Sequence, residues 1–451
     1  MSRAGVKGGG DGNFIFGGVD VVDLAEQYGT PLYITDENKI RENYRSYKTA
    51  FETVENEIYF AVKANGNLAL LRILASEGAG ADVFSSGELR LVELAGIPKD
   101  KVLMNGNSKS EDELIDAVES EVKISVDSLE ELQTLSAVAV EIGKEAEIAI
   151  RVNPDVSPDT HPKIATGLSR SKFGLPYQQI LESYEEAKRL PNIVIKGIHC
   201  HIGSQILEIS VFKEATEKMM KLVEELYDRG IELEFVDLGG GLGIPYNKTE
   251  EMPGPTPEDL AEMILPAFKS TLKSLGINLK LILEPGRSIV GPASILLSRV
   301  NTIKRAYSNF VAIDAGFNLL LRPSMYGAYH EVIVANKLSE LSKLSEDKHE
   351  LAVDSASAPV LTTVVGPVCE SGDIIAKDRM LRPVKRGDLI AILDVGAYGF
   401  SMSSQYNGRP RCAEVLVCDG MVDVIRSRET VEDLLRNQII PQRLERRAVE
   451  R

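Results

Sequence analysis

The chain has 451 residues, of which 43% are hydrophobic and 26% charged, and this ordinary globular composition excludes a fully disordered chain. Acidic residues (67) outnumber basic ones (51), and the formal net charge of −16 disfavours nucleic acid as a partner. No uninterrupted apolar run approaches the roughly 20 residues of a membrane span, so we expect no membrane partner. At about 150 residues per domain, the length predicts two or three domains, or one barrel with an addition.

The N-terminus and the cysteines indicate the compartment. Residues 1–12 contain five glycines and no apolar segment, so we expect a flexible tail and not a signal peptide. Four cysteines are too few for a disulfide framework in a chain of this length. They are Cys200, Cys369, Cys412 and Cys418. Both features favour a reducing, cytoplasmic setting.

Between residues 58 and 287, short β-rich runs alternate with segments of helical spacing. Most runs are continuous apolar stretches, which is typical of strands covered on both faces. The runs span residues 58–63, 81–85, 102–105, 123–127, 147–153, 195–203, 234–241 and 280–286. Eight such runs, spaced by about 30 residues, predict an α/β fold with a (β/α)8 (TIM) barrel and not an open doubly wound sheet.

After residue 287 the pattern changes to β-strands separated by Gly, Pro and Asp turns. Strands are predicted at residues 294–305, 309–313, 360–365, 388–393 and 413–417. They predict a second, mostly β domain, which the short strands at 14–16 and 32–34 would join. The predicted domains are a flexible tail (1–12), N-terminal strands joining the β domain (13–40), the barrel (41–292), the β domain (293–435) with a polar surface insertion (337–357), and a charged tail (436–451).

Residues of unusual chemistry stand where the barrel runs end, and barrel enzymes place their sites at these strand ends. Lys63 follows four apolar or aromatic residues, so burial should disfavour its charged form and free the amine for Schiff-base chemistry. The glycine loop at 239–241 suits an anion or a tight turn. Glu284 stands between an apolar strand and Pro285, where a carboxylate needs a partner. That partner could be Arg287 or the ring nitrogen of a cofactor.

His199 and His201 form an H-x-H pair at the sixth run. In a strand both side chains point to the same face, so they could hold a metal ion or contact the core or a cofactor. A zinc site needs further ligands, and the sequence contains neither H-E-x-x-H nor C-x-x-C. We therefore predict no metal, and keep a metal-dependent hydrolase as an alternative.

The predicted β domain carries three further candidates. Cys369 stands beside an acidic residue, where it could donate a proton or be a small buried cysteine. Arg322 and Tyr326 are candidates for carboxylate recognition, because the guanidinium offers a planar fork of donors.

Six motifs follow one another along the chain: YFAVKAN, HCHIGSQ, DLGGGLGIPY, EPGRSIVG, GPVCESGD and GAYGFSMSSQYN. With them, the chain resembles the diaminopimelate decarboxylases from about residue 14 to 435. This family belongs to the alanine-racemase-like (fold type III) group of enzymes that use pyridoxal 5′-phosphate (PLP), and it joins a (β/α)8 barrel to a β domain. Related decarboxylases of ornithine, arginine and carboxynorspermidine typically carry Cys-Asp where this chain has Cys-Glu.

The resemblance implies a role for each candidate residue. Lys63 would hold PLP as a Schiff base, His201 would stack on its ring, and Glu284 would keep the pyridine nitrogen protonated. Further cofactor contacts, largely at the phosphate, would come from Gly241, Pro285, Gly286, Arg287 and Tyr398. The substrate would be bound by Arg287, Arg322 (distal carboxylate), Tyr326, Glu370 (distal ammonium) and Tyr398.

The implied reaction is PLP-dependent decarboxylation of meso-2,6-diaminopimelate to L-lysine and CO2, the last step of lysine biosynthesis. Lys63, His201 and Cys369 would be catalytic, with Cys369 as the acid. In the family, Cys369 and Glu370 reach the site from the partner subunit, so the resemblance implies a homodimer with shared active sites. The alternatives are a non-catalytic PLP-binding or partner-binding homologue and the metal-dependent hydrolase.

Overall fold

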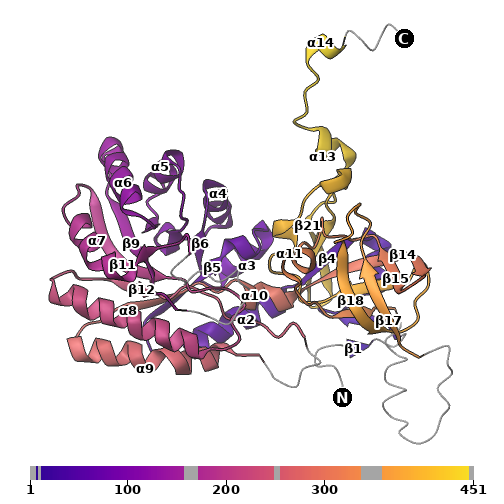
Figure 1. Cartoon of the computed structure of the whole chain (residues 1–451), viewed down its shortest axis with the longest axis horizontal. Coiled ribbons are helices and arrows are strands. Elements are labelled where there is room, and N and C mark those ends of the chain that lie inside the picture. The colour runs from indigo at the N-terminus through magenta and orange to yellow at the C-terminus, as the bar shows by residue number, and fades with distance from the viewer. Residues whose placement is uncertain (1–6, 9–11, 157–170, 248–253, 337–357, 446–451) are drawn as a thin grey trace, which may run out of the picture.

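The computed structural model describes residues 7–8, 12–156, 171–247, 254–336 and 358–445. A barrel wrapped by helices lies beside a smaller domain made mostly of strands (Figure 1). The predicted insertion at 337–357 lies outside the described residues. Of the predicted flexible tail (1–12), residues 7, 8 and 12 are described, and the first two form strand β1 (Lys7–Gly8).

Within the described chain, eight parallel strands close the barrel, which confirms the predicted (β/α)8 fold. In sheet order they are β9 (Ala146–Asn153), β11 (Ile193–Cys200), β12 (Phe235–Asp237), β13 (Lys280–Leu283), β5 (Asn56–Ala61), β6 (Gly80–Val83), β7 (Val102–Met104) and β8 (Lys123–Val126). Strand β8 pairs with β9 and closes the circle, and the short β10 (Leu175–Pro176) pairs with β9 outside it. Most candidate residues follow the last residue of a strand, so they stand at the rim of the barrel.

Amphipathic helices cover the outside of the barrel. They are α2 (Glu37–Ala50), α3 (Leu68–Ser76), α4 (Ser86–Ala95), α5 (Glu111–Glu119), α6 (Leu129–Ile142), α7 (Ile180–Ala187), α8 (Ser210–Asp228) and α9 (Pro257–Leu275). Their apolar faces share one core with the strands. A smaller cluster fills the interior: Tyr59, Leu103, Ala149, Phe235 and Ile282. The barrel is thus a packed core and not a pore.

The β domain is built from both ends of the chain. Its sheet runs β18 (Ile374–Leu381), β17 (Val360–Val365), β15 (Asn309–Ile313), β14 (Ser294–Arg305), β4 (Leu32–Asp36), β20 (Ala413–Cys418) and β21 (Met421–Arg426). Strand β19 (Leu389–Ile392) pairs with β14 and with β16 (Val332–Val334). The N-terminal β4 lies between β14 and β20, as predicted for residues 32–34. Because β14 begins at Ser294, we propose a domain boundary at residues 292–293.

The other N-terminal strand differs from the prediction. Strand β2 (Phe14–Phe16) pairs with β1 and β3 (Val19–Asp20) in a separate small sheet. It still contacts the β domain, because Phe14 is buried in that core and its N–H donates to Ala335 O at 2.7 Å. Helix α1 (Val21–Tyr28) packs there as well.

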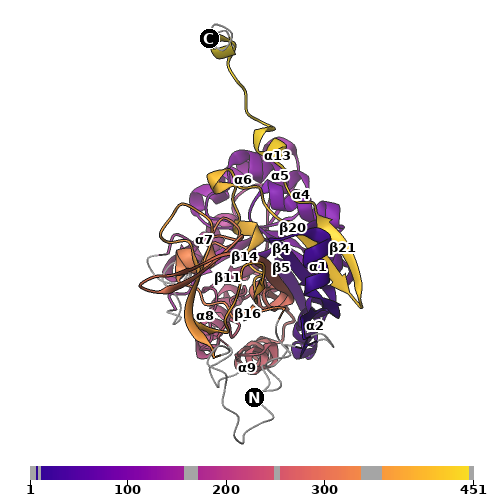
Figure 2. The same ribbon diagram turned by 90° about the vertical axis from the view of Figure 1, so that its right-hand side faces the viewer.

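Short helices complete the described chain. Helix α10 (Arg287–Val290) begins after the eighth barrel strand, and α11 (Arg322–Tyr326) lies in the β domain. The C-terminal α13 (Val431–Leu435) and α14 (Gln442–Glu445) extend away from both domains in the two views (Figures 1 and 2). Among the described residues, no helix is both long and apolar enough to span a bilayer.

A β-bulge in β11 decides which of its side chains face the barrel interior. The pairing of β11 with β9 shifts register between Ile195 and Gly197. Before the shift, Ile195 packs toward the outer core; after it, a Cβ on Gly197 would lie 2.4 Å from the ring of Phe235 in the interior. The bulge therefore turns His199, two residues further on, into the barrel.

Tyr184 of α7 satisfies the backbone groups at this bulge. Its buried hydroxyl donates to Gly197 O at 2.7 Å and accepts from Ile150 N at 3.4 Å. A buried backbone group that loses its partner destabilises the fold. The hydroxyl thus replaces hydrogen bonds that the bulge removes from the strand pairing.

We expect Tyr184→Phe to lower the free energy of unfolding by about 1–2 kcal/mol, because Gly197 O loses its donor. Urea unfolding of the purified protein measures this change. Tyr227→Phe, at an exposed position on α8, is the matched control and should change stability little. Equal stability losses in the two variants would contradict the role given to the Tyr184 hydroxyl.

Candidate active site

Lys63 lies in a single 3-10 turn, Val62–Ala64, directly after β5. Its ammonium forms an ion pair with Asp82 of β6 and lies 4.3 Å from the centre of the Phe84 ring. Burial acts to lower the pKa of Lys63, but the carboxylates of Asp82 and Glu284 outweigh it and the pKa is raised. Burial thus disfavours the charged form, as predicted, but the predicted net lowering of the pKa is wrong, because the prediction did not include these two carboxylates.

Lys63 reaches a cavity of about 130 Å³ at the rim of the barrel. The cavity is lined by Lys63, Phe84, Asn105, Arg151, Phe173, His199, His201 and Glu284. An apolar cavity of roughly 150 Å³ accommodates a benzene ring, so this space suits one small aromatic ring. The lining side chains combine aromatic, cationic and anionic groups around that space.

Glu284 follows β13 and is 3% exposed. The amide nitrogen of Asn105 is 2.7 Å from Glu284 Oε1 and 2.7 Å from Asp82 Oδ1, and donates to both. Burial raises the pKa of Glu284, although the charges of Lys63 and Arg151 act to lower it. Asn105 thus ties together the two carboxylates nearest Lys63.

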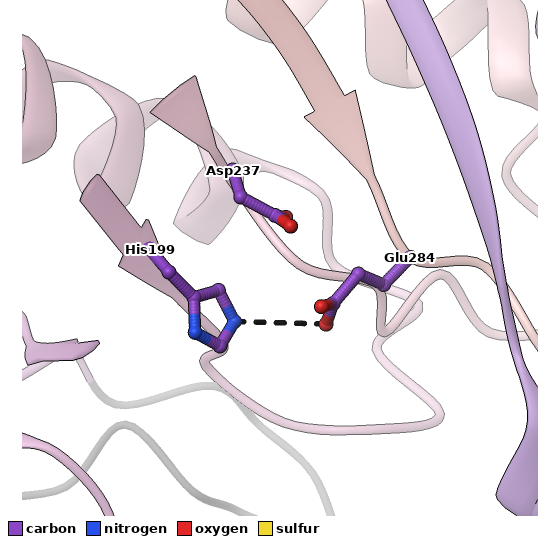
Figure 3. A group of neighbouring side chains, drawn as sticks. All are labelled: His199, Asp237 and Glu284. Atoms are coloured by element: carbon purple, nitrogen blue, oxygen red, sulfur yellow. Dashed lines mark ion pairs between the residues drawn. The ribbon is translucent and has the colours of Figure 1, made fainter. Parts of the chain in front are cut away.

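His199, Asp237 and Glu284 converge from three neighbouring strands (Figure 3). His199 Nε2 lies 3.6 Å from Glu284 Oε2, and its Nδ1 is hydrogen-bonded to Ser125 Oγ at 2.7 Å. Burial lowers the pKa of His199 well below its usual value, with the charge of Arg151 adding to the effect. His199 is therefore neutral.

Asp237 and Glu284 are buried side by side, and two carboxylates in such a place do not both ionise. Burial raises the pKa of Asp237 well above its usual value, and the charge of Glu284 raises it further. Lys63 and Arg151 act on Glu284 in the opposite direction. The proton is thus held on Asp237, and Glu284 is the charged member of the pair.

The two histidines of the H-x-H pair are used separately. One ligand atom each from His199, Asp237 and Glu284 lies within 4.8 Å of the others. In the described chain, the spacing that a metal ion would need is therefore found between His199 and two acids, and not between the two histidines. His201 Nδ1 instead accepts the Gly240 N–H at 3.2 Å. Burial, with the charge of Lys63, lowers the pKa of His201, so its imidazole is neutral. A hydrolase site built on His199 with His201 finds no support in this arrangement.

The glycine loop after β12 packs backbone against backbone. A Cβ on Gly240 would lie 2.0 Å from Glu284 O, and one on Gly241 would lie 2.4 Å from Gly203 O, so only glycine fits. The Gly240 N–H is already bonded to His201. The Gly241 N–H donates to no described residue, so it is the donor of this pair that an anion can use.

The loop after Glu284 packs on the segment that carries Lys63. Pro285 O accepts the Ala61 N–H at 3.2 Å. A Cβ on Gly286 would lie 3.0 Å from the Cβ of Ala61, so a larger residue would separate the two segments. This close packing brings the loop after the last barrel strand against the loop after the first.

A second group gathers two buried arginines around Tyr246. Arg287 donates to Tyr246 Oη at 2.8 Å and to Ser204 Oγ at 2.9 Å, and its guanidinium lies 4.9 Å from the Tyr398 ring centre. It therefore does not pair with Glu284, which was one alternative. Arg322, from the β domain, lies 4.4 Å from the Tyr246 ring centre. Two neighbouring cations favour an anion between the domains.

Tyr326 ends α11, four residues after Arg322, and is half-buried. Its phenol acts to raise the pKa of Arg322, although burial has the larger, lowering effect. Tyr326 is thus close enough to Arg322 to belong to the same group.

Cys369 and Glu370 lie on an exposed loop of the β domain and do not line the cavity at Lys63. Asn407 Nδ2 donates to Cys369 Sγ at 3.1 Å, and Tyr406 Oη donates to Glu370 Oε1 at 2.7 Å. The hydrogen bond with Glu370 raises the pKa of Tyr406 to about 12. One chain thus brings Lys63, Glu284 and the two arginines together, but holds Cys369 and Glu370 on another surface.

Several residues of the site were not predicted: Asp82, Asn105, Arg151, Ser204, Asp237, Tyr246 and His330. Asp82, Asn105 and Arg151 are polar residues in or directly after apolar strands, and that contrast could have identified them. Ser204 and Tyr246 lie in loops, where no periodicity predicts the path of the chain.

Comparison with known proteins agrees with this geometry. Residues 37–291 match the family of the pyridoxal-dependent decarboxylase, pyridoxal binding domain. The barrel, the lysine at its rim and the buried carboxylate beside it are those of a PLP-dependent decarboxylase, and PLP is the cofactor.

The similarity extends over nearly the whole chain. It is 54% identical over 433 residues to the diaminopimelate decarboxylase of Archaeoglobus fulgidus, covering 96% of this chain and 98% of that protein. The crystal structure of the M. jannaschii diaminopimelate decarboxylase in complex with L-lysine has a TM-score of 0.89 and 41% identity, covering 98% of this chain and all of that one. The Helicobacter pylori enzyme, also complexed with L-lysine, has a TM-score of 0.83 and 38% identity, covering 95% of this chain and 100% of that one. The chain belongs to the diaminopimelate decarboxylase family.

We expect Asp237→Asn to change how the stability of the cofactor-free protein depends on pH. Because the folded-state pKa of Asp237 is raised, the folded protein keeps a proton that the unfolded chain releases above about pH 3.9. Stability therefore falls as the pH rises from that value toward the folded-state pKa. The asparagine copies the protonated acid, so the fall should be smaller and the variant more stable at pH 8.

Urea unfolding at pH 5, 6.5 and 8 measures this dependence. Asp228→Asn, at an exposed position on α8, is the matched control. An Asp237→Asn curve parallel to that of the wild type would show that Asp237 does not hold the proton.

Proposed function

We propose that the chain catalyses the PLP-dependent decarboxylation of meso-2,6-diaminopimelate to L-lysine and CO2, the last step of lysine biosynthesis. The observation that carries the proposal is one ring-sized cavity with Lys63 and the buried Glu284 in its wall. The structures of two relatives contain L-lysine, which is what remains of diaminopimelate after one carboxylate leaves as CO2.

The residues of the cavity fit PLP. Lys63 supplies the amine for its aldehyde, Glu284 a carboxylate for its ring nitrogen, and His201 a neutral ring to stack on it. Gly241, whose N–H donates to none of the residues that the structure describes, suits its phosphate. The loop of Pro285, Gly286 and Arg287, with Tyr398 beside it, suits the phosphate as well. When bound, PLP accepts the electron pair that the departing CO2 leaves behind.

The chain's own residues set the charges around that reaction. Asn105 fixes the Glu284 carboxylate and Asp237 holds the neighbouring proton, so Glu284 keeps its negative charge toward the ring nitrogen. Asp82 binds the Lys63 amine and holds it beside the cavity when the amine is protonated. Asn105, Asp237 and Glu284 are buried, and the lower dielectric of a buried site strengthens each of these interactions.

Substrate recognition falls to the group at the domain boundary. Arg322, with Tyr326 near it, binds the distal carboxylate. Tyr398, which contacts Arg287, is near enough to Arg322 and to Lys63 to act on the pKa of both. Glu370 binds the distal ammonium. The opposite charges of these groups match a substrate that carries an amino-acid end away from the reacting carbon.

We expect kcat/KM for meso-diaminopimelate to exceed that for ornithine and for arginine by tenfold to hundredfold, roughly the effect of one charge-assisted contact to the distal carboxylate. Release of CO2 and formation of lysine measure it. Borohydride reduction followed by peptide mapping should place the pyridoxyl label on Lys63, and Lys63→Ala is the control that loses it. A protein that binds PLP and turns over none of the three compounds would be a non-catalytic homologue.

We further propose a homodimer with shared active sites, in which Cys369 and Glu370 enter the site of the partner subunit and Cys369 protonates the α-carbon. Their exposed loop, apart from the Lys63 cavity of the same chain, supports this arrangement. All four cysteines are outside disulfides, which supports a reducing, cytoplasmic location.

Cys369→Ala should lower turnover strongly and leave the cofactor content unchanged, because the residue contacts the reacting carbon and not PLP. Mixing this variant with Lys63→Ala tests the shared site. A hybrid dimer has one site with both residues intact, so random mixing should restore about a quarter of wild-type activity. Hybrids that form and stay inactive would place Cys369 in the site of its own chain, whereas full turnover by Cys369→Ala alone would place Cys369 outside the reaction.

A further inference from the structure

His330 lies buried between the guanidinium of Arg322 and the backbone after β19. Its Nδ1 is 2.8 Å from Leu393 O, and its Nε2 is 2.7 Å from Arg322 Nη1. A carbonyl oxygen only accepts hydrogen bonds and a guanidinium only donates them. The ring must therefore carry its proton on Nδ1 and offer the Nε2 lone pair to Arg322.

This neutral state of His330 agrees with its surroundings. Burial lowers the pKa of His330 to about 3, and the charge of Arg322 adds to the effect. The rings of His330 and Tyr246 also pack in a T-shaped arrangement, with their centres 5.0 Å apart. His330 is thus a fixed acceptor that packing holds in one orientation.

The side chain of Arg322 makes one hydrogen bond within the described chain and contacts the Tyr246 ring, so several of its N–H donors are unused by described residues. It is 4% exposed, and its hydrogen bond to His330 is the one that its side chain makes to a described residue. A guanidinium has five N–H donors, so four remain for an anion. Burial is the main cause that lowers the pKa of Arg322, and repulsion by the charge of the neighbouring Arg287 lowers it further. Without the hydrogen bond to His330, the contact with the Tyr246 ring would remain, but no hydrogen bond to a described residue would fix the direction of the guanidinium N–H groups.

We propose that His330 is a positioning residue that orients Arg322 toward the distal carboxylate of the substrate. This inference rests on the proposed function, because it takes Arg322 as the group that binds that carboxylate. The ligands concerned are amino acids that keep a carboxylate at the end away from the reacting carbon. Diaminopimelate and its product L-lysine have this carboxylate, and the diamine cadaverine lacks it.

Two variants of similar size separate the acceptor from the rest of the side chain. In His330→Gln, Oε1 can take the place of Nε2 and accept from Arg322. In His330→Asn, Nδ2 can take the place of Nδ1 and donate to Leu393 O, but no acceptor faces Arg322. The glutamine variant should therefore keep the orientation of Arg322, and the asparagine variant should lose it.

The experiment compares both variants with the wild-type holoenzyme. We expect His330→Asn to raise KM for meso-diaminopimelate by about tenfold to hundredfold with kcat changed less than about threefold, and His330→Gln to stay within about threefold in KM. Binding of L-lysine, measured by calorimetry, should weaken by a similar factor in His330→Asn, whereas binding of cadaverine should not change. A general structural defect would weaken both ligands together.

Equal KM values for the two variants, or equal weakening of L-lysine and cadaverine, would overturn the proposal. If the wild type does not decarboxylate diaminopimelate, the proposed function fails, and the two binding measurements still decide the role of His330. If His330→Asn does not fold, the nitrogen NMR signals of wild-type His330 decide: a proton on Nε2 would contradict the inferred hydrogen bond to Arg322.

Discussion

Hydrogen bonds from the β domain hold the backbone that carries Lys63. Ala64 O, one residue after Lys63, accepts the Tyr398 N–H at 2.8 Å, and Asn65 Nδ2 donates to Gly396 O at 3.1 Å. Tyr398 adopts a left-handed backbone conformation (φ 57°), which a bulky residue rarely does. Its N–H bond to the barrel and the packing of its ring on Arg287 stabilise that conformation. The β domain therefore adds to the contacts within the barrel that hold the backbone of Lys63.

The charges of the site are divided between two places. Asp82, Asp237 and Glu284 form an acidic group at the barrel rim, and Arg287 and Arg322 form a basic group at the domain boundary. The acidic group suits a cationic ring nitrogen and an amine, and the basic group suits carboxylates and phosphate. The net charge of −16 gives no sign of this division. Local placement by the fold, and not bulk composition, determines what binds.

The sequence was sufficient for the barrel and for the residues at its strand ends, because parallel strands covered on both faces are continuous apolar runs. Strand β18 escaped prediction, since three consecutive charged residues, Lys377, Asp378 and Arg379, interrupt its apolar pattern. The predicted direction of the pKa shift of Lys63 was wrong for another reason. The pKa of Lys63 depends on Asp82 and Glu284, which are distant in the sequence and meet only in the closed barrel. His330 gave no sequence signal, since its role depends on the path of two loops.

The position of β4 has a consequence for how the chain folds during synthesis. Its two neighbours are β14 and β20, in which Leu32 is opposite Leu297 and Ala413. Strand β4 therefore has neither partner until the ribosome has synthesised the entire barrel. The barrel strands have their neighbours within residues 56–283 and can assemble first. The β domain is completed last, so its hydrogen bonds to the backbone next to Lys63 form only near the end of translation.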